Sequence, residues 1–176
     1  MLFRSRNLAN GLASGADQAM LVGAGGAEPL GIVNTPGIGS VSGTSLDRAK
    51  ILDMQTKAND QSAVLSARAQ GYVAPPVTAA LLANRQEYTG VASTLWAGSL
   101  AQGQIAGVTA MSTKSMTVGS LLYGDFSQLV LVEFGPMQIS VNTADFNKAL
   151  AAIRALWMVD VMELEPKSFT LATSVT

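Results

Sequence analysis

The stretch from Ser14 to Ile38 constrains the fold most, because it joins a helical pattern to a dense cluster of glycines. Ser14 and Asp17 have the spacing of a capping box, which predicts a helix over residues 15–22. Gly23 follows directly, and glycine readily takes the left-handed conformation that ends many helices. The sequence therefore predicts a structural turn that uses Gly23, Gly25, Gly26, Pro29 and Gly31.

The glycine cluster also invites comparison with a phosphate-binding loop. A phosphate loop ends in Gly-Lys-Ser or Gly-Lys-Thr, and the dinucleotide fingerprint comes directly after a strand. The cluster here follows a helical pattern and lacks that lysine. A packing turn is therefore the preferred interpretation. A small-ligand or nucleotide-binding enzyme that uses the loop from Gly23 to Gly31 is kept as an alternative of another class.

The residue types in the chain exclude several chemistries. There is no cysteine and no histidine, which removes thiol chemistry and the commonest general base and metal ligand. The Ser-x-x-Lys and Gly-x-Ser-x-Gly nucleophile motifs are absent as well. The clustered carboxylates of Asp160, Glu163 and Glu165 suit a surface, and Asp125 suits a turn. We therefore predict no enzymatic activity, no catalytic or metal-binding residues and no cofactor.

Charged residues are scarce. They make up 13% of the chain, whereas about 25% is usual in globular proteins. Because the cores of protein interfaces are poor in charge, this scarcity favours a surface that neighbouring subunits cover. A compact monomer coated in serine and threonine is the alternative. The net charge of −1, without a basic stripe, argues against sequence-specific nucleic-acid binding. No apolar run reaches the ~18 residues of a membrane span, so no membrane contact is expected.

Downstream of the glycines the pattern changes from helices to short strands. A second capping box at Thr44–Asp47 predicts a helix over residues 45–58, and Pro75 and Pro76 suit the first turn of another helix. Runs of β-forming residues predict strands at 72–74, 105–109, 121–123, 129–134 and 137–141. The last two strands flank Gly135-Pro136, which predicts a hairpin.

The segment from Asp145 to Glu165 is ambiguous, because its apolar residues fit either a helix or one face of a long strand. Both tryptophans are expected to pack rather than to stack on nucleic-acid bases. The expected packing anchors are Trp96, Trp157 and Phe146.

Five motifs follow one another along the chain. The first runs from Asp17 to Ile32 and contains the glycine cluster and the Glu-Pro-Leu-Gly-Ile turn. The second is Tyr72-Val-Ala-Pro-Pro-Val-Thr-Ala-Ala-Leu-Leu82. The other three are Gly107–Ser112, Val118–Phe126 and the segment from Phe146 to Phe169. In this order, the motifs resemble the C-terminal half of Hong Kong 97-type major capsid proteins of tailed bacteriophages and prophages.

The resemblance implies an α+β fold of the Hong Kong 97 type, with an axial domain whose central β-sheet is flanked by helices. It implies a peripheral, spine-side remnant over 1–44, the axial domain over 45–145, and a long strand over 146–176 that returns to the peripheral domain. Residues 149–163 would be mostly strand. The family's N-terminal arm, extended loop and most of its spine helix normally precede the first motif, so the chain is expected to be truncated.

The resemblance implies a structural function. The chain would be a major capsid subunit that assembles with copies of itself, as pentamers and hexamers, into the icosahedral shell of a virion. Assembly would take place in the bacterial cytoplasm, with a scaffold, portal or maturation protease as further partners and nonspecific contact with packaged DNA. An encapsulin-like compartment shell is the neighbouring alternative. Some family members join subunits by Lys–Asn isopeptide bonds. Ala149 and Leu156 stand where the asparagine and its assisting glutamate would be, so no such cross-link is expected.

Overall fold

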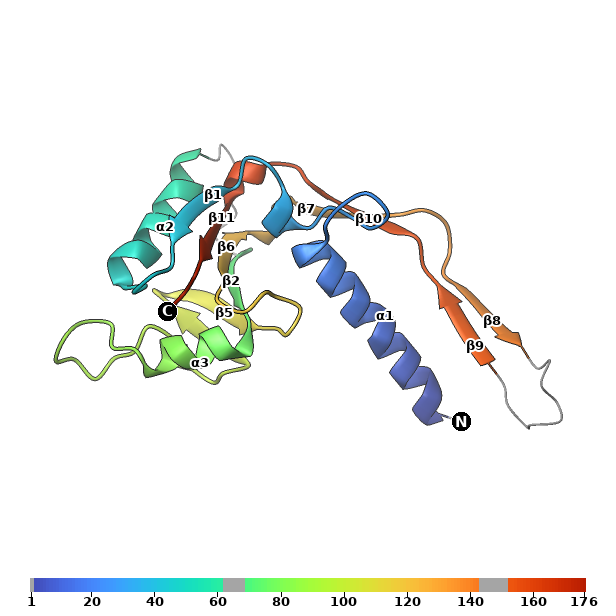
Figure 1. Cartoon of the computed structure of the whole chain (residues 1–176), viewed down its shortest axis with the longest axis horizontal. Coiled ribbons are helices and arrows are strands. Elements are labelled where there is room, and N and C mark those ends of the chain that lie inside the picture. Colours follow the sequence, from blue (N-terminus) through green and yellow to red (C-terminus); the bar gives the residue numbers. More distant parts are fainter. Residues whose placement is uncertain (1, 62–68, 143–151) are drawn as a thin grey trace.

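The computed structural model of the chain describes residues 2–61, 69–142 and 152–176. Figure 1 shows a central sheet with two helices beside it at one end of the molecule. Helix α1 (Leu2–Val22) and a two-stranded ribbon extend from this sheet toward the other end. Residues of α1 and of the ribbon line the same grooves, so the two extensions lie side by side.

The central sheet has seven strands in the order β1-β11-β6-β2-β5-β4-β3. Strand β1 pairs in parallel with β11, and β2 pairs in parallel with β5, whereas the other neighbours are antiparallel. The strand bounds are β1 Gly39–Ser42, β2 Gln70–Ala74, β3 Ala97–Gly98, β4 Gln102–Ile105, β5 Val108–Ser112, β6 Leu121–Asp125 and β11 Phe169–Thr173. Residues before 45 and after 145 thus contribute strands to the same sheet, and the division at 44 and 145 stays a prediction.

Alternation along the strands gives the sheet two apolar faces, because successive side chains point to opposite sides. On β6, Leu121 and Tyr123 belong to the core under helices α2 (Arg48–Gln61) and α3 (Pro76–Asn84). Leu122 belongs to a second core, which the end of α1 and the 3₁₀ turn Ile32–Asn34 cover. Every residue of β6 is buried as a result.

Two helix starts differ from the sequence predictions. Helix α1 begins at Leu2, so Ser14 lies inside the helix, and the predicted capping box at Ser14 and Asp17 is wrong. Gly11 and Gly15 do not interrupt it, since a helix tolerates glycine at a cost of about 1 kcal/mol each. Helix α2 begins at Arg48 rather than 45, because Asp47 alone caps it. The Asp47 Oδ1 atom accepts a hydrogen bond from the Lys50 backbone N–H at 2.9 Å.

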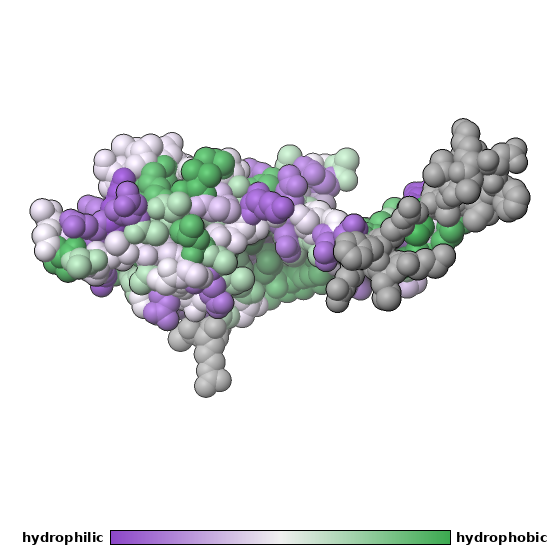
Figure 2. All heavy atoms as spheres, turned by 90° about the horizontal axis from the view of Figure 1, so that it is seen from below, coloured by the Kyte–Doolittle hydropathy of each residue, from purple (hydrophilic) through white to green (hydrophobic). Residues whose placement is uncertain are grey.

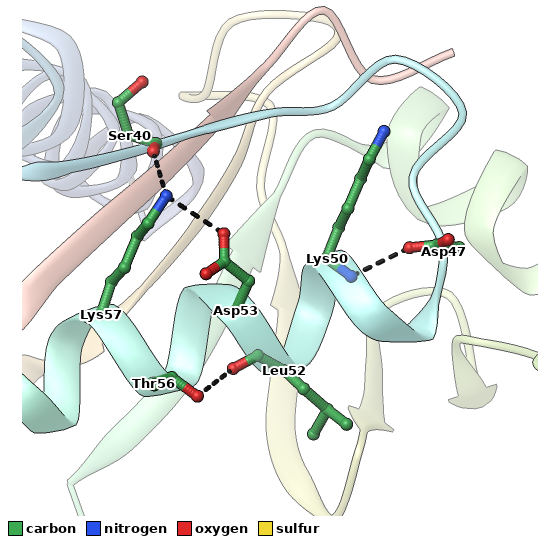
Figure 3. A network of polar contacts seen from close by, with 7 residues as sticks. All are labelled: Ser40, Asp47, Lys50, Leu52, Asp53, Thr56 and Lys57. Carbon is green, nitrogen blue, oxygen red and sulfur yellow. Dashed lines mark hydrogen bonds and ion pairs between the residues drawn. The ribbon is translucent and has the colours of Figure 1, made fainter.

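Polar contacts along α2 fasten it to the sheet, as Figure 3 shows. The Lys57 ammonium group forms an ion pair with Asp53 at 3.1 Å, one helical turn away. The same ammonium group donates a hydrogen bond to the Ser40 carbonyl of β1 at 3.0 Å. Lys57 therefore joins the exposed side of α2 to the edge strand of the sheet.

The expected strand over 105–109 is interrupted by a tight turn. Ala106 and Gly107 both have positive φ angles, of 49° and 82°, and they connect β4 to β5. Ile105 pairs directly with Val108, which leaves a two-residue hairpin loop of the kind that needs two left-handed residues. The sequence hid this turn because alanine rarely takes that conformation.

The expected hairpin around Gly135-Pro136 is also wrong. Strand β7 (Leu129–Glu133) pairs with β10 (Val159–Glu163), and β8 (Gln138–Asn142) pairs with β9 (Ala152–Leu156), both antiparallel. These two pairs follow each other and form the ribbon. Residues 134–137 lie opposite residues 157–158, so Gly135-Pro136 marks an offset between the pairs rather than a reversal of the chain. The strand interpretation is confirmed for residues 152–163, apart from the break at 157–158. Phe146 and Ala149 lie outside the described residues.

Two tyrosine rings, tilted by 41° to each other, are in contact in the core beneath α2. The rings of Tyr72 and Tyr123 lie 4.7 Å apart, and both side chains are buried. Burial raises the pKa of each hydroxyl above its ordinary value of 10.0.

The raised pKa predicts a loss of stability in alkali. The unfolded chain releases the Tyr72 proton at a lower pH than the folded chain, so the free energy of unfolding falls as pH rises above 10. For Tyr72 alone the expected slope is about −1.4 kcal/mol per pH unit. Urea unfolding at several pH values should show at least this slope in the parent chain, because Tyr123 adds to it, and a shallower one in Tyr72→Phe. Equal slopes would contradict the assignment.

Candidate assembly surface

The joint between α1 and the sheet is a close backbone contact between Gly23 and Gly31. The Gly31 N–H donates a hydrogen bond to the Gly23 carbonyl at 2.9 Å. A Cβ atom on Gly31 would lie 2.6 Å from the Val22 nitrogen and 2.7 Å from the Leu21 carbonyl carbon. A Cβ atom on Gly23 would lie 2.5 Å from the Ala19 oxygen and would also collide with the Pro29 carbonyl. Both positions therefore require glycine.

The loop between Gly23 and Gly31 contains two left-handed glycines and an internal hydrogen bond. Gly25 and Gly26 take positive φ angles of 81° and 83°, which turn the chain back after α1. Gly23 does not, so the left-handed helix end expected there occurs further along the loop. The Glu28 carboxylate accepts a hydrogen bond from the Ala24 N–H at 2.8 Å.

The Asn34 side chain closes the end of α1. Its amide donates to the Val22 carbonyl at 3.1 Å and to the Gly23 carbonyl at 2.9 Å. The loop thus meets the carbonyl end of a helix, which repels anions, and it presents a carboxylate of its own. This geometry favours a packing turn over a phosphate cradle.

The expected packing anchors lie in different environments. Trp96 is 1% exposed, and its indole N–H donates to the Ser99 carbonyl at 2.8 Å. Trp157 is half-buried at the break between β9 and β10, where it lines the grooves beside α1. Phe146 is outside the residues that the structure describes.

The carboxylates considered for catalysis are dispersed. Asp125 is buried, and its Oδ1 atom accepts hydrogen bonds from the N–H and the hydroxyl of Ser127. Asp160 accepts from the neighbouring Val161 N–H. Among the described residues, no group of three Asp or Glu side chains converges as a metal site. Within the same ranges, no helix is long and apolar enough to cross a membrane.

The ribbon presents an apolar face to α1. Ile139 pairs with Ala155, and Val141 pairs with Ile153, which places these four side chains on one face. Together with residues of α1 they line a groove of about 680 Å³. The exposed fractions of Ile139 and Val141 are 60% and 61%, although both are β-branched and apolar. The groove residues are Leu8, Ala9, Leu12, Ala13, Ala16, Asp17 and Met20 of α1, and Glu133, Met137, Ile139, Val141, Ile153, Ala155 and Trp157 of the ribbon.

A second groove, of about 690 Å³, runs between α1, the glycine loop and the break in the ribbon. Phe134 and Met158 line it and are 56% and 52% exposed. In Figure 2 green, apolar atoms gather between the sheet and the ribbon. Exposed apolar side chains gathered along two adjacent grooves make this face a candidate interaction surface.

The position of this surface could not be predicted from the sequence. The alternation of Gln138-Ile-Ser-Val-Asn142 correctly indicated a strand with one apolar face. It did not show that β9 would be the partner of this strand, or that α1 would lie beside the apolar face without covering it.

Comparison with known proteins identifies the fold. The family model described as the phage capsid family matches residues 5–174. The capsid of the native GTA particle is 17% identical, with a TM-score of 0.74 over 99% of this chain and 65% of that chain. The Gordonia phage Cozz structure is 14% identical, with a TM-score of 0.64 over 96% of this chain and 61% of that chain. The holo-SrpI encapsulin complex of Synechococcus elongatus PCC 7942 is 16% identical, with a TM-score of 0.60 over 97% of this chain and 64% of that chain.

This chain thus spans less than two thirds of each of these solved chains. No curated protein matches it in sequence. The expected α+β fold of the Hong Kong 97 type is confirmed by these structures. Because the family model covers nearly the whole sequence, the chain belongs to the phage capsid family.

Proposed function

We propose that the chain is a major capsid subunit, which forms the icosahedral shell of a tailed phage or prophage. One observation carries the proposal: the family match over residues 5–174, with the same fold as the GTA capsid over 99% of the chain. The scarcity of charge and the apolar grooves beside α1 support it, since both suit a surface that neighbours cover.

The work of such a subunit is non-covalent association. Copies of the chain meet as pentamers and hexamers, and each contact buries apolar surface that the single chain exposes. The virion is the proposed location, with assembly in the bacterial cytoplasm. A scaffold, portal or maturation protease would be transient partners, and contact with packaged DNA would be nonspecific because the chain has no basic stripe.

An encapsulin-like compartment shell is the second candidate. The SrpI encapsulin shares the fold, with a TM-score of 0.60. The GTA capsid has a higher TM-score of 0.74 over more of the chain, which favours the phage-type shell.

Electron microscopy of the gene product, expressed in bacteria, tests the proposal. The expected result is rings or closed shells. Nucleic acid inside the shells would favour the phage-type capsid, and a protein cargo would favour the compartment. A product that stays monomeric across concentrations and salts would reject both.

Assembled shells are also expected to lack isopeptide cross-links. Leu156, where the assisting glutamate would stand, is apolar and 39% exposed, and it cannot accept a proton. Ala149, where the asparagine would stand, has no amide, and it lies outside the described residues. Boiling purified shells in detergent should release single chains on a denaturing gel. A ladder of covalent multimers would contradict this expectation.

A further inference from the structure

We propose that strand β8 (Gln138–Asn142) is a self-association edge, which pairs antiparallel with β8 of a second copy around Ser140. The two ribbons would then form one four-stranded sheet in the order β9-β8-β8-β9. This inference rests on the proposed function for its partner, another copy of the chain, and it names the strand through which two copies meet.

Within the described residues, the ribbon has a free edge along β8. Within residues 2–61, 69–142 and 152–176, β8 pairs with β9 alone, so its other side carries unpaired backbone N–H and C=O groups. A two-stranded ribbon is marginally stable in water, and a third or fourth strand with an apolar face stabilises it. Such an edge is a template for another strand.

The free edge of β8 lacks the features that usually protect an edge strand from pairing. Proteins shield free edges from pairing with charged side chains, proline or bulges. Strands β7, β9 and β10 carry the charges of Glu133, Arg154, Asp160 and Glu163. Strand β8 has no charge and no proline, and two of its residues are β-branched and apolar. Of the ribbon's strands, β8 is therefore the one suited to accept a partner.

The sequence of β8 is self-complementary in an antiparallel pair. The alternation in Gln138-Ile139-Ser140-Val141-Asn142 is symmetric about Ser140. In an antiparallel pair centred there, Ser140 lies opposite Ser140 of the second copy, and Ile139 lies opposite its Val141. Opposite residues of an antiparallel pair share a face, so both Ile-Val pairs join the apolar face beside α1. A two-fold contact requires this kind of matching, in which one patch binds itself.

Cysteine cross-linking tests the register, because the chain has no cysteine of its own. In the proposed pair, Ser140→Cys places two thiols on Cα atoms about 5 Å apart, within the range of a disulfide. The matched control is Gln138→Cys, on the same polar face and also exposed. Its thiol would lie about 13 Å from its own counterpart, four residues along the strand.

We expect oxidised Ser140→Cys to form covalent dimers at least about tenfold faster than Gln138→Cys on a non-reducing gel. Equal rates, or no dimer from Ser140→Cys, would overturn the proposed pairing.

A charge-swap experiment tests the same contact without a covalent bond. Ser140→Lys places like charges opposite each other at the two-fold axis, and we expect weaker self-association in sedimentation velocity. Mixing Ser140→Lys with Ser140→Glu replaces the repulsion by attraction, so the mixture should associate more strongly than either variant alone. A mixture no better than its components would refute the pairing, and circular dichroism of each variant checks that the fold is kept.

The two proposals can fail separately. If the gene product forms shells but its Ser140→Cys variant does not cross-link, the capsid function is supported and the β8 contact is rejected. If the Ser140→Cys variant cross-links but the gene product never forms rings or shells, the β8 contact is supported and the capsid function is rejected.

Discussion

Replacing Gly31 by alanine is expected to lower the free energy of unfolding by about 3 kcal/mol, at the upper end of overpacking effects. The new methyl group would lie 2.6 Å from the Val22 nitrogen and would also collide with the Gly23 nitrogen. Both are backbone atoms, so the clash cannot be relieved by a side-chain rotation. The end of α1 has to move away, and the hydrogen bonds from Gly31 to Gly23 and from Asn34 to Val22 are lost.

Urea unfolding followed by circular dichroism measures this loss. Two glycines provide matched controls, because a Cβ added to either meets no atom within 4 Å apart from its chain neighbours and, for Gly11, the backbone of its own helix. Gly26→Ala should cost about 1 kcal/mol, since its φ of 83° is strained for alanine. Gly11→Ala, inside α1, should stabilise the chain by about 1 kcal/mol, because alanine favours the helix. If Gly31→Ala costs no more than Gly26→Ala, the joint is not the close contact described here.

Features set by neighbouring residues could be predicted from the sequence. The start of α3 after Pro75 depends on a local backbone preference, and this prediction is confirmed. The predicted end of α1 before Gly23 is also confirmed, but Gly23 is not left-handed, and the close approach of the Pro29 carbonyl is what requires glycine there. The start of α1 could not be predicted in the same way. Two glycines and a serine lower its intrinsic helix propensity, yet the helix continues through them.

Strand pairing depends on distant residues, and the predicted pairing of β7 with β8 is wrong. The Gly-Pro turn between β7 and β8 suggested a hairpin of these two strands. Instead, β7 pairs with β10, more than twenty residues further along the chain, and β8 pairs with β9, which begins ten residues after β8 ends. The alternation of a strand shows which face is apolar and does not show which strand lies beside it. The central sheet also joins segments that are distant in the sequence, since β1 near the start of the chain pairs with β11 near its end.

The apolar grooves beside α1 could not be located from the sequence for a related reason. The low charge content predicted that part of the surface would be covered, without indicating where. The apolar face of a strand is normally buried. Ile139 and Val141 are exposed because α1 lies beside their face without covering it. An expected core residue that the fold leaves exposed is the clearest sign of an interface in this chain.

The buried tryptophan offers the second large effect on stability. Trp96→Ala is expected to lower the free energy of unfolding by about 3–5 kcal/mol, because it leaves a cavity in the core shared by α2, α3 and the sheet. Gly103 lies so close to the indole that a Cβ there would collide with its Nε1 atom. The backbone cannot easily collapse further into the space, so the cavity should persist.

Trp157→Ala is the matched control, since it removes the same side chain from a half-buried site on the ribbon. Its expected cost in the isolated chain is about 1 kcal/mol, because much of the ring already meets solvent. Both variants are unfolded in urea below the concentration at which the chain associates. This separates a role in the core of the single chain from a role in assembly. Trp157 should matter more in assemblies, where neighbours would cover the grooves that it lines. A loss for Trp157→Ala equal to that for Trp96→Ala would show that the ribbon and α1 already form a packed core in the single chain.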